Sequence, residues 1–315
     1  MHPEIKILSQ LAAQVVPGGT LQRVWSLTGG MSAQLTALQL LLPNGQTQRL
    51  VVRQPNPAVL RHNPRAAAVE YRLLQLLFAA GVPVPQPLWL DESAKILPTP
   101  YVVTAFVAGK MDFALEYAGR YAVQMAEQLA AIHRMKGWKG LGLPLAEGCW
   151  EQTSSAKANA ALGEEPIRAA LAKYGLWQPQ NELVLLHGDF WPGNVLWEGG
   201  ELMAVLDWED AKVGDPLLDL AISRLDLAWI FSPETAEVFT KRYGELTAVS
   251  LTNLPYWDLC AALRFIRITQ ANLAPWAAYY QPFNRPNITE QTIHRNYLWF
   301  VNQALAKWGE SLIGE

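Results

Sequence analysis

The chain has 315 residues, of which 50% are hydrophobic and 17% charged, so it can bury a sizeable core and lacks the composition of a disordered chain. Its formal net charge of -3 provides no basic excess, which argues against nucleic acid as the main partner. Cys149 and Cys260 are the only cysteines, too few for a disulfide framework or a zinc cluster. The first residues lack the pattern of a signal peptide, and no apolar stretch reaches about 18 residues. We therefore expect a cytoplasmic protein, a monomer or a homodimer, that binds neither nucleic acid nor membrane.

The first hundred residues have the pattern of a small antiparallel sheet. Apolar alternation interrupted by turn sequences such as Pro43-Asn44-Gly45 predicts strands, and helical spacing that stops at Gly81 predicts a helix. In chain order we expect a helix at residues 4–16, strands at 21–27, 33–42 and 49–53, a helix between 63 and 81, and strands at 88–90 and 101–107.

Three features of this region each allow two interpretations. The loop Gly29-Gly30-Met31-Ser32 is explained by a hairpin turn that needs positive φ, or by a backbone that approaches a polyphosphate without side-chain obstruction. Arg53 is either a solvated strand residue or a two-pronged group that holds phosphate oxygens. Glu70 is either a solvated helical residue or the ion-pair partner of Arg53.

After residue 106 the pattern becomes mostly helical. We therefore divide the chain into an N-terminal lobe of residues 1–105 and a C-terminal lobe of residues 106–315, with a hinge near 104–109. His133, on the last turn of the first long helix, is better explained as a packed core residue than as a catalyst. The expected elements are helices at 117–135 and 164–174, strands at 183–186, 195–197 and 202–206, a helix that starts at 215–216, and helices at 233–247, 254–275 and 288–309.

The most informative stretch lies between short apolar runs. Asp189 and Asn194 are on the loop before a hairpin, and Asp207 is where the second strand of that hairpin ends. Three oxygen-bearing side chains are thus expected to converge. Such a set suits a hard cation such as magnesium and a group that activates a hydroxyl.

With these motifs the chain resembles the aminoglycoside phosphotransferase and choline kinase-like family, whose fold is related to that of protein kinases. The resemblance rests on His187-Gly188-Asp189 followed by Asn194, on Leu206-Asp207-Trp208, and on the run from Gly214 to Ala221. It implies an α+β, two-lobed protein kinase-like fold. The N-terminal lobe would be a small antiparallel β-sheet with one helix, and the C-terminal lobe would be larger and mainly helical.

The resemblance also implies roles for individual residues. Asp189 would be the catalytic base, while Asn194 and Asp207 would hold Mg2+ against the phosphates of ATP or GTP, the co-substrate. Phosphoryl transfer mainly requires such positioning and charge neutralisation. The nucleotide-binding residues implied are Gly29, Gly30, Ser32, Arg53, Glu70, and, at the hinge, the carbonyl of Ala105 and the N–H of Val107.

Three residues in or near the catalytic loop are expected to be structural. His187 follows a buried strand and would hold the shape of the loop through backbone hydrogen bonds. Asp215 would cap the N-terminus of the following helix, and Asp219 would lie in its first turn, where the helix dipole favours a carboxylate.

Arg53 departs from the family pattern, which has lysine at this position. An arginine keeps the positive charge and offers a two-pronged fork, but its geometry differs from that of an ammonium group. The favoured function is a small-molecule kinase, and the alternative is a nucleotide-binding pseudokinase with a regulatory role. A protein kinase is disfavoured because Gly214 follows Asp207 almost directly, without an activation-loop segment.

The acceptor would be an amino alcohol, an aminoglycoside-like molecule or a related small hydroxyl compound. Acidic and aromatic side chains together suit a cationic acceptor. Arg264 and Arg267, on the same predicted helix as Asp258, leave an anionic or mixed-charge acceptor open. The candidate acceptor-binding residues are Trp150, Glu151, Asp226, Trp229 and Asp258.

Overall fold

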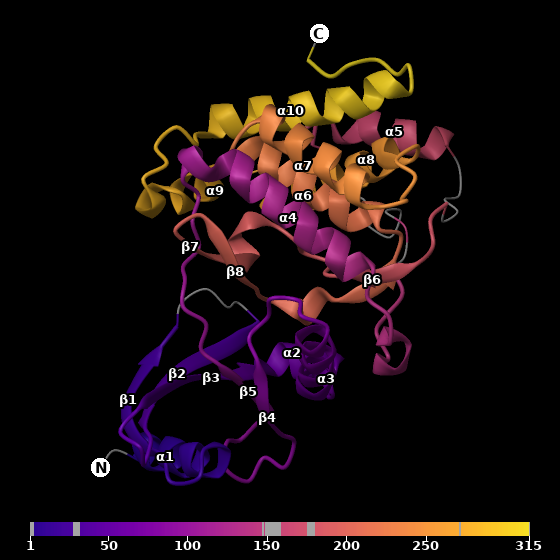
Figure 1. Ribbon diagram of the computed structural model, residues 1–315. Helices are drawn as coiled ribbons and strands as arrows, with labels where there is room; N and C mark the ends of the chain where they lie inside the picture. Colours follow the sequence, from indigo (N-terminus) through magenta and orange to yellow (C-terminus); the bar gives the residue numbers. More distant parts are fainter. Residues whose placement is uncertain are drawn as a thin grey trace. The chain divides into compact units, whose positions relative to one another are not determined.

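The computed structural model describes residues 3–27, 32–146, 148, 159–174, 180–270 and 272–314. The chain divides into two compact units. The first unit comprises Met1–Ala108, Gly137–Gly142 and Met203–Glu209. The second unit comprises Gly109–Lys136, Leu143–Leu202 and Asp210–Glu315. Strands dominate the first and helices the second, so the expected α+β class is confirmed (Figure 1).

The first unit is built on a five-stranded antiparallel sheet with the order β1-β2-β3-β5-β4. Its elements are α1 (Pro3–Val15), β1 (Thr20–Ser26), β2 (Ala33–Leu41), β3 (Thr47–Pro55), α2 (Pro57–His62), α3 (Ala66–Ala79), β4 (Pro87–Asp91), β5 (Tyr101–Ala105) and the 3-10 turn η2 (Trp138–Leu141).

The expectation of one helix in this lobe is wrong, because three α-helices occur in the described part of the first unit. Helix α2 was missed. It has six residues, too few for an apolar pattern to recur, and starts from Asn56, whose side chain accepts hydrogen bonds from two backbone N–H groups. Pro57 then occupies the first turn, where its missing N–H has no cost.

The strand register determines which face of the sheet each helix covers. Leu50 and Val52 on β3 belong to the buried cluster that includes Leu8 and Leu11 of α1. Because side chains alternate along a strand, Arg53 points to the other face, where it forms an ion pair with Glu70 of α3. Helices α1 and α3 therefore lie on opposite faces of β3.

The second unit is mainly helical. Its helices are η1 (Leu115–Tyr117), α4 (Ala118–His133), α5 (Glu164–Lys173), η4 (Pro192–Asn194), α6 (Leu217–Ile230), α7 (Pro233–Leu246), α8 (Leu254–Thr269), α9 (Ala274–Tyr279), η6 (Gln281–Phe283) and α10 (Glu290–Lys307). Its strands are β6 (Val184–Leu186), paired with β9 (Lys212–Gly214), and β7 (Val195–Glu198), paired with β8 (Glu201–Val205), which continues into the first unit. The 3-10 turn η5 (Trp208–Asp210) follows β8.

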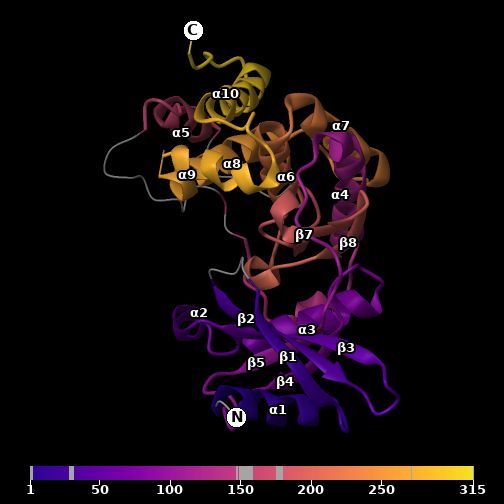
Figure 2. The ribbon, with the colours of Figure 1, turned by 90° about the vertical axis from the view of Figure 1, so that its left-hand side faces the viewer.

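Helix α6 is the centre of the second unit. It contacts α7, α8 and α10, and Figure 2 shows it between α8 and α7. Nearly all of its residues are buried, including the polar residues Asp219, Ser223, Arg224 and Asp226. A buried polar side chain needs a partner, so each of these marks a specific contact of α6. Of the helices that the structure describes, none combines the length and the apolar character needed to cross a membrane.

Candidate active site

The loop after β6 has a backbone that only glycine allows at its second position. Gly188 has φ of 84°, and a Cβ there would lie 2.1 Å from the carbonyl oxygen of Asp210. His187 and Gly188 then point their backbone N–H groups at one carboxylate, that of Asp219 on α6, at 2.7 and 2.9 Å. His187 is fully buried, and its Nδ1 accepts a hydrogen bond from the N–H of Asp189 at 3.3 Å.

Asp219 is thus the anchor of this loop. It is fully buried, and His133 Nε2 lies 3.3 Å from its Oδ2 while His133 Nδ1 contacts the hydroxyl of Tyr243 at 2.7 Å. Burial would raise the pKa of Asp219, but the contact with His133 and the bond from the N–H of Gly188 outweigh it and lower that pKa. Asp215 has a different place: its carboxylate accepts from the N–H of Leu217 at the start of α6 and from Asn181. Loop support therefore comes from Asp219.

Asp189 and Asn194 are joined by direct hydrogen bonds. The side-chain amide of Asn194 donates to the backbone oxygen of Asp189 at 2.8 Å and to its Oδ2 at 3.0 Å. A second bond from α6 holds the same segment, because the hydroxyl of Ser223 donates to the carbonyl oxygen of Phe190 at 2.5 Å. The Asp189 carboxylate is thus presented by a fixed backbone and is about one quarter exposed.

Arg264 of α8 forms an ion pair with the other carboxylate oxygen of Asp189. Asp226 of α6 is influenced electrostatically by both residues and accepts a hydrogen bond from the indole N–H of Trp229 at 2.9 Å. Burial raises the pKa of Asp226 to about 7, against the opposing effects of Arg264 and the Trp229 bond. The second unit therefore gathers Asp189, Arg264 and Asp226 in one electrostatic group.

The candidate acceptor residues separate into three groups. Asp226 and Trp229 belong to the group around Asp189, although Trp229 is only 2% exposed. Asp258 does not belong to it: this residue is 1% exposed and forms an ion pair with Arg224 at 3.2 Å, so it is part of the core between α6 and α8. Trp150 and Glu151 lie outside the described residues. The sequence pattern did not separate a buried structural aspartate from one near the site, because both occur in apolar helices.

In the first unit Arg53 is surrounded by carboxylates. Its Nε lies 2.8 Å from Glu70, and its NH2 lies 3.2 Å from Asp207 and 3.0 Å from Glu209. Burial opposes the charge of Arg53, but the three carboxylates outweigh it and raise the pKa of its guanidinium. Burial also raises the pKa of Glu70. The pairing with Glu70 agrees with the ion-pair interpretation, whereas Glu209 was not anticipated.

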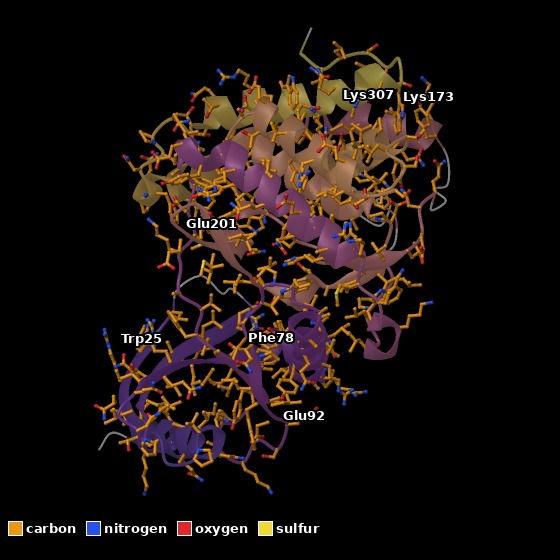
Figure 3. The ribbon with its side chains drawn as sticks, viewed as in Figure 1. Trp25, Phe78, Glu92, Lys173, Glu201 and Lys307 are labelled. Carbon is orange, nitrogen blue, oxygen red and sulfur yellow. The ribbon has the colours of Figure 1, made fainter. Side chains whose placement is uncertain are left out.

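The remaining nucleotide-binding candidates of the first unit are less constrained. Gly29 and Gly30 lie outside the described residues, and Ser32 directly precedes β2. At the proposed hinge, the N–H of Ala105 donates to the oxygen of Gln86 at 2.9 Å, and Val107 follows the end of β5. Trp25 of β1, labelled in Figure 3, has its ring centroid 6.2 Å from that of Phe106, so an aromatic pair lies next to the hinge residues.

Each unit carries one of the two side chains that the sequence motifs imply as magnesium ligands. In the described ranges, no group of three or more His, Cys, Asp or Glu side chains is arranged to hold a metal ion. Magnesium differs from a caged metal because it usually takes one or two protein oxygens and completes its shell with phosphates and water. Asp207 in the first unit and Asn194 in the second each carry a side-chain oxygen of this kind.

A family model described as "Phosphotransferase enzyme family" matches residues 13–258 of the chain. Among curated relatives, acyl-CoA dehydrogenase family member 11 of Rattus norvegicus is 28% identical over 258 residues, which cover 70% of this chain and 33% of that protein. The Homo sapiens protein of the same name is 30% identical over 257 residues, with 70% and 32% covered. The chain spans about a third of the length of these relatives.

Solved structures of similar fold cover nearly the whole chain. A putative aminoglycoside phosphotransferase from Ralstonia eutropha has a TM-score of 0.61 at 18% identity, covering 95% of this chain and 98% of its own. A macrolide 2'-phosphotransferase from Brachybacterium faecium has a TM-score of 0.60 at 23% identity, with 94% and 97% covered. A choline/ethanolamine kinase family protein from Mesorhizobium loti has a TM-score of 0.52 at 20% identity, with 94% and 99% covered. The fold is therefore the protein kinase-like fold of these phosphotransferases, as the motifs predicted.

Proposed function

The chain belongs to the phosphotransferase enzyme family, and from this premise we propose that it transfers the γ-phosphoryl group of ATP or GTP to a hydroxyl group of a small molecule, with Asp189 as the base. The observation that carries the proposal is the loop from His187 to Asn194. Its backbone is held by Asp219 and Ser223, and its one partly exposed carboxylate is oriented by Asn194. A group that must aim a hydroxyl requires this kind of fixed position.

The transfer step is a displacement at phosphorus. The acceptor oxygen forms a bond to the γ-phosphorus, the bond from that phosphorus to the β–γ bridging oxygen breaks, and the nucleoside diphosphate leaves. The hydroxyl proton passes to the carboxylate of Asp189. Because the transition state of phosphoryl transfer is loose, Asp189 mainly orients the hydroxyl and need not be a strong base.

The other candidate residues would bind the nucleotide. Asn194 and Asp207 would supply oxygen ligands to Mg2+, which neutralises phosphate charge when it is bound. Arg53, held by Glu70, would contact phosphate oxygens, and the loop of Gly29, Gly30 and Ser32 would cover them. Ala105 and Val107 would pair with the edge of the base through their backbone groups.

The comparisons support two kinds of acceptor. The similar structures include an enzyme that acts on a macrolide and a choline/ethanolamine kinase family protein, which supports an aminosugar or an amino alcohol. The relatives named acyl-CoA dehydrogenase family member 11 join a region like this chain to a further two thirds of sequence. That arrangement supports an acceptor whose hydroxyl is carried by an acyl-CoA, since joined regions commonly act on one compound.

The test is a screen of nucleotide and acceptor together, read by mass gain of one phosphoryl group. The panel contains kanamycin, erythromycin, choline, and the CoA thioesters of 3- and 4-hydroxybutyrate, each with ATP or GTP and Mg2+. We expect transfer to at least one acceptor and its loss in Asp189→Asn. Transfer that persists in Asp189→Asn would overturn the role of Asp189.

The alternative, a pseudokinase, rests on Arg53. Its ion pair with Asp207 would compete with a metal for that carboxylate. A pseudokinase would show a thermal shift with nucleotide and Mg2+ but no transfer to any acceptor of the panel. Arg53→Lys is informative here, because a lysine restores the family residue and would raise the rate of transfer if the guanidinium limits it.

A further inference from the structure

We propose that Arg264 selects the acceptor: its guanidinium beside Asp189 favours an acceptor with a carbonyl or carboxylate oxygen near the reacting hydroxyl and disfavours one with an ammonium group there. This inference rests on the proposed function of Asp189.

The first step is the position of Arg264. It is directly paired with the carboxylate proposed to orient the acceptor hydroxyl. The side chains of Arg264 and Asp189 are 21% and 25% exposed, so an acceptor that reaches Asp189 also reaches the guanidinium. The positive charge of Arg264 therefore acts directly on an acceptor bound at Asp189.

The second step is the unused hydrogen-bonding capacity of this side chain. A guanidinium carries five N–H donors, yet Asp189 is the one partner that Arg264 has in the part of the chain that the structure describes. The other donors therefore remain available to oxygen atoms of a ligand. Arginine recognises carboxylate and carbonyl oxygens well because its donors form a rigid fork.

The third step is the small net charge of the group around Arg264. Asp189 balances the charge of Arg264 directly, and Asp226 is a second acidic side chain that interacts with Arg264. Burial keeps Asp226 partly protonated near neutral pH, so the three side chains together carry less than one full negative charge. An ammonium group near Asp189 would consequently find little net negative charge to hold it and would lie beside the cationic Arg264.

Trp229 and Tyr280, the two aromatic side chains that interact with Asp226, do not form a cation site that would reverse this preference. Trp229 and Tyr280 pack edge to face, with ring centroids 5.4 Å apart, and they are 2% and 0% exposed. Their ring faces are occupied by protein neighbours. A cation–π cage requires exposed faces, so these rings serve the core.

The experiment compares Arg264→Gln with wild type on two acceptor classes, kanamycin and choline against the CoA thioesters of 3- and 4-hydroxybutyrate. We expect wild type to prefer the thioesters in kcat/KM. In Arg264→Gln we expect that preference to fall by tenfold or more, mainly through a higher KM for the thioesters. Arg264→Lys, which keeps the charge but lacks the rigid fork of donors, should retain only part of the preference.

The matched control is Arg267→Gln. Arg267 is the same residue type on the same helix three residues later, it is exposed, and no contact ties it to Asp189. Arg267→Gln should leave the ratio of kcat/KM between the two acceptor classes unchanged. The melting temperature with ATP and Mg2+ reports whether each variant is folded.

The outcomes separate the two proposals. If wild type phosphorylates an acceptor but Arg264→Gln leaves the ratio between the classes unchanged, the selection by Arg264 is overturned and the kinase function stands. A wild-type preference for kanamycin or choline also overturns the selection. If wild type phosphorylates nothing in either class, the proposed function falls and the inference falls with it.

Discussion

The two ends of helix α6 carry the same residue in opposite electrostatic states. Asp219, near the start, and Asp226, two turns later, are both almost completely buried. The pKa of Asp219 is lowered, whereas that of Asp226 is raised to about 7. Burial alone would raise both, so burial is not what distinguishes them.

The difference lies in the hydrogen-bond donors. Asp219 receives two backbone N–H groups of the catalytic loop and contacts His133, while Asp226 receives one bond, from Trp229 on its own helix. A carboxylate with several donors keeps its charge in the interior, and one with a single donor tends to bind a proton. The start of α6 therefore holds a structural charge, and its end holds a titratable group near the proposed base.

The largest effect is expected for Asp219→Asn. The amide replaces one of the two carboxylate oxygens by a donor that faces a backbone N–H group, and it removes the charge that His133 and the loop stabilise, so the free energy of unfolding should fall by about 3 to 5 kcal/mol. Urea denaturation at pH 7 measures this loss. Asp210→Asn is the control, since Asp210 is exposed and its change should stay within about 0.5 kcal/mol.

The pH dependence of the Asp219 variant sharpens this prediction. Because the pKa of Asp219 is lowered in the folded protein, its stabilising contribution is present above the unfolded pKa near 4 and is lost as the pH falls below it. The loss of stability of Asp219→Asn relative to wild type should therefore shrink in acid. An equal loss at pH 3 and pH 7 would contradict the structural charge.

The stability of Asp226→Asn relative to wild type should depend on pH in the opposite way to that of Asp219→Asn. The folded pKa of about 7 lies above the unfolded value near 4, so the stabilisation from a bound proton is complete below pH 4 and is lost as the pH rises through 7. The full cost of the ionised form is at most about 4 kcal/mol at pH 8. The asparagine avoids this cost, so the variant should gain stability over wild type at pH 8 compared with pH 5, measured by urea denaturation. If the free energies of unfolding of the two proteins change with pH in parallel, the pKa of Asp226 is not raised in the folded protein.

The sequence predicted the fold well where the pattern was long or sharply bounded. The hairpin that ends before Asp207 was placed correctly because Gly199 and Gly200 separate its strands, and α7 was placed correctly because it is long and strongly periodic. The short elements α2, α9 and β9 were missed, since three to six residues are too few for an apolar pattern to repeat recognisably. Helix α8 ends at Thr269 rather than 275, because Gln270 takes positive φ.

The site was predicted less completely, since pair contacts between distant segments leave no local pattern. Asp189 and Asn194 were singled out by their spacing in one loop. The anchoring role of Asp219 depends on a loop 31 residues away, and the pairing of Arg264 with Asp189 depends on one 75 residues away. Asp258 and Asp226 both occur in apolar helices, and only their partners, Arg224 and Trp229, reveal that one is structural.

A smaller effect is expected for Ser223→Ala, in the middle of α6. Its hydroxyl donates to the carbonyl oxygen of Phe190, so the alanine leaves that buried oxygen without a donor from α6 and should cost about 1 to 2 kcal/mol. This bond belongs to the same support of the loop as the bonds of Asp219. The two variants should therefore be non-additive in a double-mutant cycle, and strict additivity would show that α6 supports the loop at independent points.

The smallest effect is expected for Trp229→Phe. The phenyl ring keeps an aromatic side chain in place but removes the N–H that donates to Asp226 Oδ1, the one hydrogen bond that stabilises its ionised form. A bond of about 1 kcal/mol corresponds to a rise of roughly 0.7 in the pKa of Asp226. An NMR titration of the side-chain carboxyl carbon of Asp226 measures this rise. Trp276→Phe is the control, because Trp276 packs against Trp229 with ring centroids 6.3 Å apart and lies outside the bond to Asp226. If both variants raise the pKa of Asp226 equally, packing rather than the indole N–H sets that pKa. Hydrogen-bond donors would then not explain why the pKa values of Asp219 and Asp226 shift in opposite directions.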